Sequence, residues 1–233
     1  MRHILMLSSS RAADEPYLEH AKPMIAEHLG DIVDVVFIPY AGVTMMLDEY
    51  TEKVQQALPS LNVKGLHEYA DPKSAISNAK AVLVGGGNTF HLLYQLYAFE
   101  LITLIQQRVN TGMPYIGWSA GSNICGETIR TTNDMPIIEP PSFNALHFLA
   151  AQINPHYTDY QPPGHNGETR DQRLAEFTQL NPKTPVLAIR EGTALLLSGD
   201  NLSLKGQLGG FVFLGSDKHP IAAGDDLKQY LGV

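Results

Sequence analysis

Residues 114–121 read Pro114-Tyr115-Ile116-Gly117-Trp118-Ser119-Ala120-Gly121, and this stretch carries the sharpest structural signal in the chain. A short β-prone run is followed by G-x-S-x-G and then by small residues that can begin a helix. A serine between glycines on a strand-to-helix turn is typical of a nucleophile elbow, which exposes its hydroxyl at the carboxyl edge of a sheet. The stretch predicts an α/β fold with Ser119 as nucleophile, and a tight turn with an incidental serine is the alternative.

On the amino-terminal side of this stretch, short β-rich runs alternate with segments of helical spacing. The expected strands are His3–Leu7, Ile32–Ile38, Val63–Leu66, Ala81–Val84 and Tyr115–Ile116. The expected helices are Pro16–Leu29, Met46–Leu58, Pro72–Ala79 and Thr89–Val109. The alternation predicts a mostly parallel central sheet with helices on both faces, a three-layer α/β arrangement.

On the carboxyl-terminal side the alternation stops. Residues 130–168 have little periodicity, and a loop of this length in a compact domain is often functional. A helix is then expected at Thr169–Leu180, followed by short strands at Pro185–Ile189, Ala194–Leu197, Ser203–Lys205 and Gly210–Leu214. Gly-Asp and Gly-Gly turns suggest that the last strands are antiparallel. We expect residues 1–233 to form one α/β domain.

Composition limits the classes of partner and cofactor. The 24 Asp and Glu residues against 16 Lys and Arg give a formal charge of −8, which argues against a nucleic-acid partner. Cys125 is the only cysteine, so neither a disulfide nor a structural zinc site is expected. The sequence contains no run of about 18 apolar residues, so no membrane span is expected. We expect a cytoplasmic monomer or homodimer that uses no metal or other cofactor.

A second glycine cluster, Gly85-Gly86-Gly87, follows the expected strand Ala81–Val84 and precedes a helix. Bare backbone N–H groups at such a position can bind an anion. They could hold a phosphate or, with the N–H of Ala120, form an oxyanion hole from Gly86 and Gly87. The cluster lacks the Lys-Ser/Thr of a P-loop, so a phosphate site is the weaker hypothesis, and a plain turn is a third.

A serine nucleophile needs a base and a carboxylate partner for that base. His156 follows Asn154-Pro155, which is expected to stop a short strand and to project the imidazole from the sheet edge; His165 is the second choice. Asp134 and Glu191 could both reach the same edge, and the residues alone do not rank them.

The blocks VGGGNTF (84–90), YIGWSAG (115–121), IRTTNDMPI (129–137), QINPH (152–156) and GETRDQR (167–173) occur in this order. The chain resembles the peptidase E family of serine hydrolases, a group that includes cyanophycinase. The resemblance implies a fold similar to the flavodoxin-like class I glutamine amidotransferases, no metal, and cleavage of dipeptides with an amino-terminal aspartate. Ser119 matches the family nucleophile and His156 its base. Asp134 matches the aspartate usually assigned as third member and is our prediction, while amidotransferase analogy favours Glu191.

Recognition of an aspartyl group requires a cation. Arg170 is the first candidate for the substrate's side-chain carboxylate and Arg130 the second. Asn88, Glu168 or the carboxylate not used in the triad could bind the substrate ammonium. The predicted function is hydrolysis of Asp-X dipeptides through an acyl-enzyme on Ser119. The alternatives are a cyanophycinase-like peptidase acting on β-aspartyl-arginine and a flavodoxin-like module that binds a phosphate or cofactor.

Overall fold

A mostly parallel sheet forms the centre of the molecule. The computed structural model describes residues 1–164 and 166–231. Within these residues seven strands pair in the order β3-β2-β4-β5-β1-β8-β9. Their bounds are β1 (His3–Leu7), β2 (Asp34–Ile38), β3 (Asn62–Gly65), β4 (Val82–Val84), β5 (Tyr115–Trp118), β8 (Ala194–Ser198) and β9 (Asn201–Lys205). The first five are mutually parallel and the last two antiparallel, as predicted.

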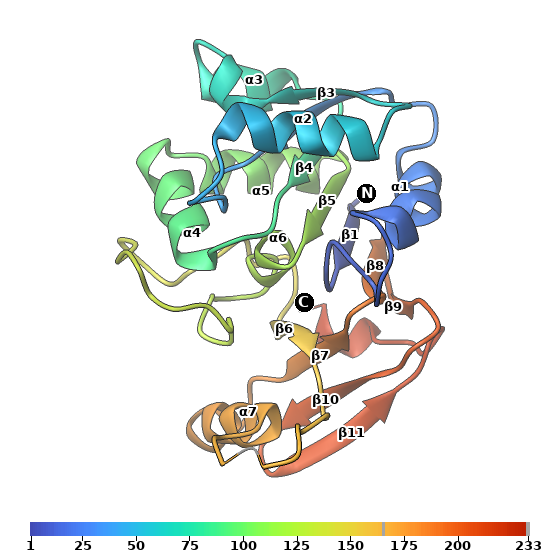
Figure 1. Cartoon of the computed structure of the whole chain (residues 1–233), viewed down its shortest axis with the longest axis vertical. Coiled ribbons are helices and arrows are strands. Elements are labelled where there is room, and N and C mark those ends of the chain that lie inside the picture. Colours follow the sequence, from blue (N-terminus) through green and yellow to red (C-terminus); the bar gives the residue numbers. More distant parts are fainter. Residues whose placement is uncertain (165, 232–233) are drawn as a thin grey trace.

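Helices cover both faces of this sheet because its strands are apolar on both sides. Along β1, Ile4 and Met6 face one buried cluster while Leu5 and Leu7 face the other. The helices α1 (Lys22–Leu29) and α2 (Leu47–Ala57) pack on the second face, and α3 (Pro72–Asn78), α4 (Thr89–Ala98) and α5 (Ile102–Asn110) pack on the first (Figure 1). The predicted three-layer arrangement is confirmed.

A second, smaller sheet lies at the lower end of the molecule in the view of Figure 1. In the described part of the chain it has four strands in the order β11-β10-β7-β6. They are β6 (Gln152–Tyr157), β7 (Val186–Arg190), β10 (Gly210–Leu214) and β11 (Asp217–Ile221), and α7 (Arg170–Leu180) packs on one face. Leu187 and Ile189 on the other face join the main core. Since β6 and β7 are parallel, their carboxyl ends share one edge.

Several sequence predictions need correction in the amino-terminal half and the central loop. The segment 89–109 forms two helices because the chain turns at Glu100, where φ is +54°. The α-helix expected from Pro16 begins only at Lys22, after a 3₁₀ turn (Glu19–Ala21). Asn154-Pro155 does not stop β6; the strand continues to Tyr157 with an irregular register.

The carboxyl-terminal strands also differ from the prediction. Gly209-Gly210 does not join two paired strands, because β9 and β10 lie in different sheets. Instead, the missing side chain of Gly210 allows close pairing with β7, where a Cβ would lie 2.5 Å from the carbonyl oxygen of Ala188. The edge strand β11 was not predicted, since Asp217, Lys218 and Pro220 are atypical of a strand. No helix in the described residues is long and apolar enough to cross a membrane.

Candidate active site

Ser119 stands on a strained turn between β5 and α6 (Ala120–Asn123), with φ +55°. The two flanking glycines make this turn possible. A Cβ on Gly117 would lie 2.3 Å from the carbonyl oxygen of Gly121, and a Cβ on Gly121 would lie 2.3 Å from that of Val84. The Ser119 N–H donates to the carbonyl of Leu7 (3.1 Å), which fixes the turn at the end of β1. The chain therefore has the strand-turn-helix context of a nucleophile elbow.

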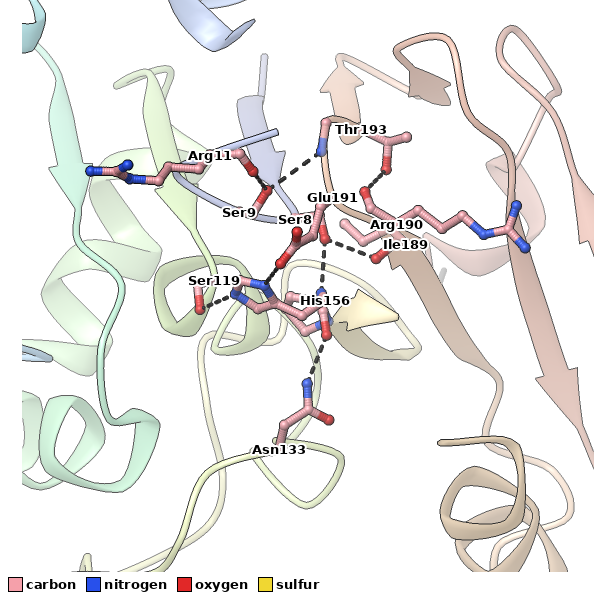
Figure 2. Close-up of polar contacts among 12 residues, drawn as sticks. Ser8, Ser9, Arg11, Ser119, Asn133, His156, Ile189, Arg190, Glu191 and Thr193 are labelled. Carbon is pink, nitrogen blue, oxygen red and sulfur yellow. Dashed lines mark hydrogen bonds and ion pairs between the residues drawn. The ribbon is translucent and has the colours of Figure 1, made fainter. Parts of the chain in front are cut away.

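His156 connects this serine to a carboxylate. Its Nε2 lies 2.8 Å from Ser119 Oγ, and its Nδ1 lies 2.6 Å from Glu191 Oε1 (Figure 2). The imidazole reaches both partners from the irregular end of β6, where His156 has φ +54°. Its side chain is 38% exposed, so a substrate can approach it. The three side chains have the order of a nucleophile, a base and an orienting carboxylate.

Asp134, the carboxylate that we predicted for this position, does not contact His156. Its Oδ2 accepts hydrogen bonds from the Thr89 N–H (2.7 Å) and the Thr132 hydroxyl (3.1 Å). These bonds place Asp134 at the amino end of α4, where a carboxylate is favoured by the helix dipole. The structure thus brings Glu191, the alternative, to the imidazole.

Ser8 links β6 and β7 at the site. Its hydroxyl donates to the carbonyl of Ile189 (2.8 Å) and accepts from the His156 N–H (2.8 Å) (Figure 2). Its own N–H donates to the carbonyl of Thr193 (2.9 Å). Ser8 is fully buried and therefore fixes the spacing of β6 and β7. Ser8 was not among the predicted site residues, although its place directly after a central strand was a usable signal.

The glycine turn after β4 lies against the nucleophile. A Cβ on Gly86 would be 3.0 Å from Ser119 Cβ. The Tyr50 hydroxyl donates to the Gly86 carbonyl (2.9 Å). Because the peptide is trans, the N–H of Gly87 points away from Tyr50. Within the described residues, the N–H groups of Gly86, Gly87 and Ala120 donate to no protein acceptor. These donors are available for a ligand.

A cavity of about 630 Å³ opens at this point. Its lining includes Ser119, His156 and Gly87. Asn88 also lines it, but both ends of its amide are engaged: Oδ1 accepts from the His91 N–H (3.0 Å), and Nδ2 donates to the Met135 carbonyl (2.9 Å). Asn88 thus has a structural role in capping α4 and holding the loop of Asp134.

The two predicted specificity arginines have different positions. Arg170, at the start of α7, donates through Nη1 to Oδ1 of Asn133, whose amide donates to the Pro155 carbonyl (2.8 Å) next to His156. Burial lowers the pKa of Arg170. Arg130 instead contacts Asn181 (3.1 Å) and the ring of Phe177, with no such link to a neighbour of His156. Neither arginine is part of the described wall of the Ser119 cavity; Arg170 lines a separate cavity with Thr158 and Asp159.

The remaining candidate residues form no hydrogen bond or ion pair with Ser119, His156 or Glu191 in the described part of the chain. Glu168 forms an exposed ion pair with Arg173 (3.5 Å) beside α7. His165, our second choice of base, is outside the described residues. Cys125 is fully buried with its Sγ 3.4 Å from the Gly121 carbonyl oxygen, and burial raises the pKa of its thiol. Among the described residues, no group of three His, Cys, Asp or Glu side chains is placed to hold a metal.

Comparison with known proteins identifies the family of the chain. Residues 4–205 match the model of peptidase family S51. The chain is 57% identical to peptidase E of Shewanella amazonensis over 97% of its length and 98% of the relative, and 56% identical to peptidase E of Shewanella denitrificans over 97% and 98%.

Solved structures show the same fold. A peptidase from an acI-B1 actinobacterium superposes with a TM-score of 0.70 at 16% identity, covering 97% of this chain and 96% of the other. A protein from Listeria monocytogenes EGD-e that carries the peptidase E designation gives 0.69 at 23%, covering 88% and 98%. The family match extends over most of the chain and includes Ser119, His156 and Glu191. The chain therefore belongs to peptidase family S51.

Proposed function

We propose that this chain is a serine dipeptidase that hydrolyses dipeptides with an amino-terminal aspartate. The observation that carries the proposal is the hydrogen-bonded line Ser119–His156–Glu191 beside free backbone donors. Membership of family S51 and the peptidase E relatives support the same activity. The substrate partner is a small peptide, and we place the reaction in the cytoplasm, where the free thiol of Cys125 is typical.

The reaction is acyl transfer to water. His156 Nε2 takes the proton of the Ser119 hydroxyl as the serine oxygen bonds to the carbonyl carbon of the aspartyl residue. Glu191 accepts a hydrogen bond from the Nδ1–H of His156 and stabilises the imidazolium. His156 then gives its proton to the leaving amine, the C–N bond breaks, and the acyl-enzyme remains. Water, deprotonated by His156, releases free aspartate and regenerates Ser119.

The oxyanion of each tetrahedral intermediate needs donors that are already oriented. The N–H groups of Gly86, Gly87 and Ala120 fill this role, since they lie beside Ser119 and donate to no acceptor in the described part of the protein. One such donor is typically worth about 3 to 4 kcal/mol of transition-state stabilisation. Tyr50 orients the Gly86–Gly87 peptide through its bond to the Gly86 carbonyl.

Two charged residues account for the choice of an amino-terminal aspartate. Arg170 binds the side-chain carboxylate. Its guanidinium donates to Asn133, and the amide of Asn133 donates to the carbonyl of Pro155, the residue before His156. Asp134 binds the substrate ammonium, because it is not used by His156 and its Oδ2 accepts from the N–H of Thr89, the residue after Asn88 of the cavity wall. Asn88 itself supports this loop.

The direct test is a product assay on purified protein. We expect release of free aspartate from Asp-Leu, much slower release of alanine from Ala-Leu, and no Asp-Arg dipeptide from β-linked aspartyl-arginine polymer. Quantitative amino-acid analysis of each reaction measures the products. Release of Asp-Arg from the polymer with no cleavage of Asp-Leu would identify the cyanophycinase-like alternative instead.

Replacing Arg170 with methionine separates specificity from chemistry. Arg170→Met keeps much of the aliphatic stem but removes the charge, so kcat/KM on Asp-Leu should fall about 100-fold while slow Ala-Leu cleavage changes little. Arg130→Met is the matched control, because its guanidinium contacts Asn181 away from the cavity. Equal losses on Asp-Leu and Ala-Leu in Arg170→Met would show that the arginine only supports Asn133.

A further inference from the structure

One cation lines the cavity that contains Ser119, and the catalytic steps do not use it. Lys53, on α2, is the only Lys or Arg among the described residues of the cavity wall, and no Asp or Glu is part of that wall. Lys53 is half-buried. Within the described part of the chain its ammonium forms no ion pair with a carboxylate. A cation in this setting can bind a ligand anion without first leaving a protein partner.

Aromatic contacts hold Lys53 at a fixed place relative to the nucleophile. Its Nζ lies 4.4 Å from the centre of the Tyr17 ring. The Tyr17 ring in turn packs edge-on against Trp118, with centroids 6.4 Å apart, and Trp118 directly precedes Ser119. Tyr17 and Ser10 line the cavity together with Lys53 and His156. This side of the cavity therefore has an apolar aromatic wall and a positive charge.

We propose that Lys53 binds the terminal carboxylate of the amino acid that leaves, and that it thereby limits the enzyme to dipeptides. This inference rests on the proposed function and names a binding site for its second substrate residue. In an Asp-X dipeptide, the residue after the scissile bond carries a carboxylate close to the amine that His156 protonates. Lys53 provides the single ammonium on the described wall of the same cavity that can pair with this anion. A longer peptide has a neutral amide there and would leave Lys53 unpaired.

The position of this carboxylate in the substrate fixes the kinetic signature. It takes no part in bond making or breaking, so Lys53 binds it equally in the ground state and in the transition state. Loss of the contact should raise KM and leave kcat nearly unchanged. A residue that only supports the fold of the cavity would instead lower kcat for every substrate.

The test pairs a change in the enzyme with a change in the substrate. Lys53→Met should raise KM for Asp-Leu about 10- to 100-fold, the effect of removing one charge-assisted contact. For the wild type, replacing Asp-Leu with Asp-Leu amide should raise KM by about the same factor. For Lys53→Met that substrate change should matter less than about 3-fold, because the two losses are one interaction. Lys53→Arg should recover most of the affinity for Asp-Leu.

Lys64→Met is the matched control. Its Nζ also lies over a tyrosine ring, that of Tyr69 (4.3 Å), but in a different cavity. It should leave both KM values as in the wild type. The proposal is overturned if Lys53→Met leaves KM for Asp-Leu unchanged, or if it impairs Asp-Leu and Asp-Leu amide equally. A wild type that cleaves neither compound would contradict the proposed function itself, and the two failures are therefore distinct.

Discussion

Ser119→Ala is expected to lower kcat on Asp-Leu by about a million-fold, the loss typical of removing a serine nucleophile. The alanine leaves no atom for His156 Nε2 to activate and none to form the acyl-enzyme. Substrate binding should survive, because the recognition of both substrate carboxylates depends on other residues. Steady-state kinetics with Asp-Leu measures the loss, and equilibrium dialysis with the same dipeptide measures the retained binding.

Two controls make this result specific. The protein should lose covalent labelling by a fluorophosphonate when Ser119 is replaced, whereas Ser142→Ala, in an exposed segment, should label normally. The thermal unfolding midpoint should not fall, since the Ser119 hydroxyl is bonded only to His156 among the described residues. Retained turnover by Ser119→Ala would exclude the acyl-enzyme mechanism.

The elbow could be predicted from the sequence because its constraints are local. A side chain at position 117 or 121 would collide with the backbone of the same turn or of the adjoining strand, so both positions require glycine. The spacing of the two glycines therefore encodes the geometry of the turn. The parallel sheet was predictable for a related reason. The run Ile32–Ile38 is almost wholly apolar, which predicted a strand covered by helices on both faces, and its buried part in β2 is Val35–Ile38. The prediction failed at strand ends, where Gln152–Tyr157 continues through a proline.

The third member of the catalytic triad could not be chosen from local sequence constraints. Glu191 meets His156 only because β6 pairs with β7, and Ser8 bridges these strands from the far end of the chain. That pairing belongs to a second sheet whose existence depends on contacts between distant segments. From the sequence alone, Asp134 was as good a candidate as Glu191 for the partner of His156. A turn-forming Asn-Asp pair in a loop can reach either an imidazole or the amino terminus of a helix. The Thr89 N–H is the partner that it reaches.

Glu191→Gln should reduce kcat by about 10³- to 10⁴-fold with little change in KM, as expected for loss of the carboxylate that orients the base. The carboxylate lies 2.6 Å from His156 Nδ1, so it selects the tautomer whose Nε2 can accept the serine proton. A glutamine amide can donate to Nδ1, which stabilises the wrong tautomer and leaves the imidazolium without a counter-charge. Burst kinetics on an aspartyl ester would locate the loss in acylation.

Asp134→Asn provides the decisive comparison because it removes the other candidate charge without changing side-chain size. Its carboxylate accepts from the Thr89 N–H at the amino end of α4, and the asparagine oxygen can keep that bond. If Asp134 binds the substrate ammonium, this variant raises KM for Asp-Leu, and its kcat stays well above that of Glu191→Gln. The opposite pattern, with kcat lost in Asp134→Asn and retained in Glu191→Gln, would restore Asp134 to the triad and leave the contact between Glu191 and His156 without a catalytic role. The two charge-removing variants thus separate a carboxylate that orients the base from one that holds the substrate.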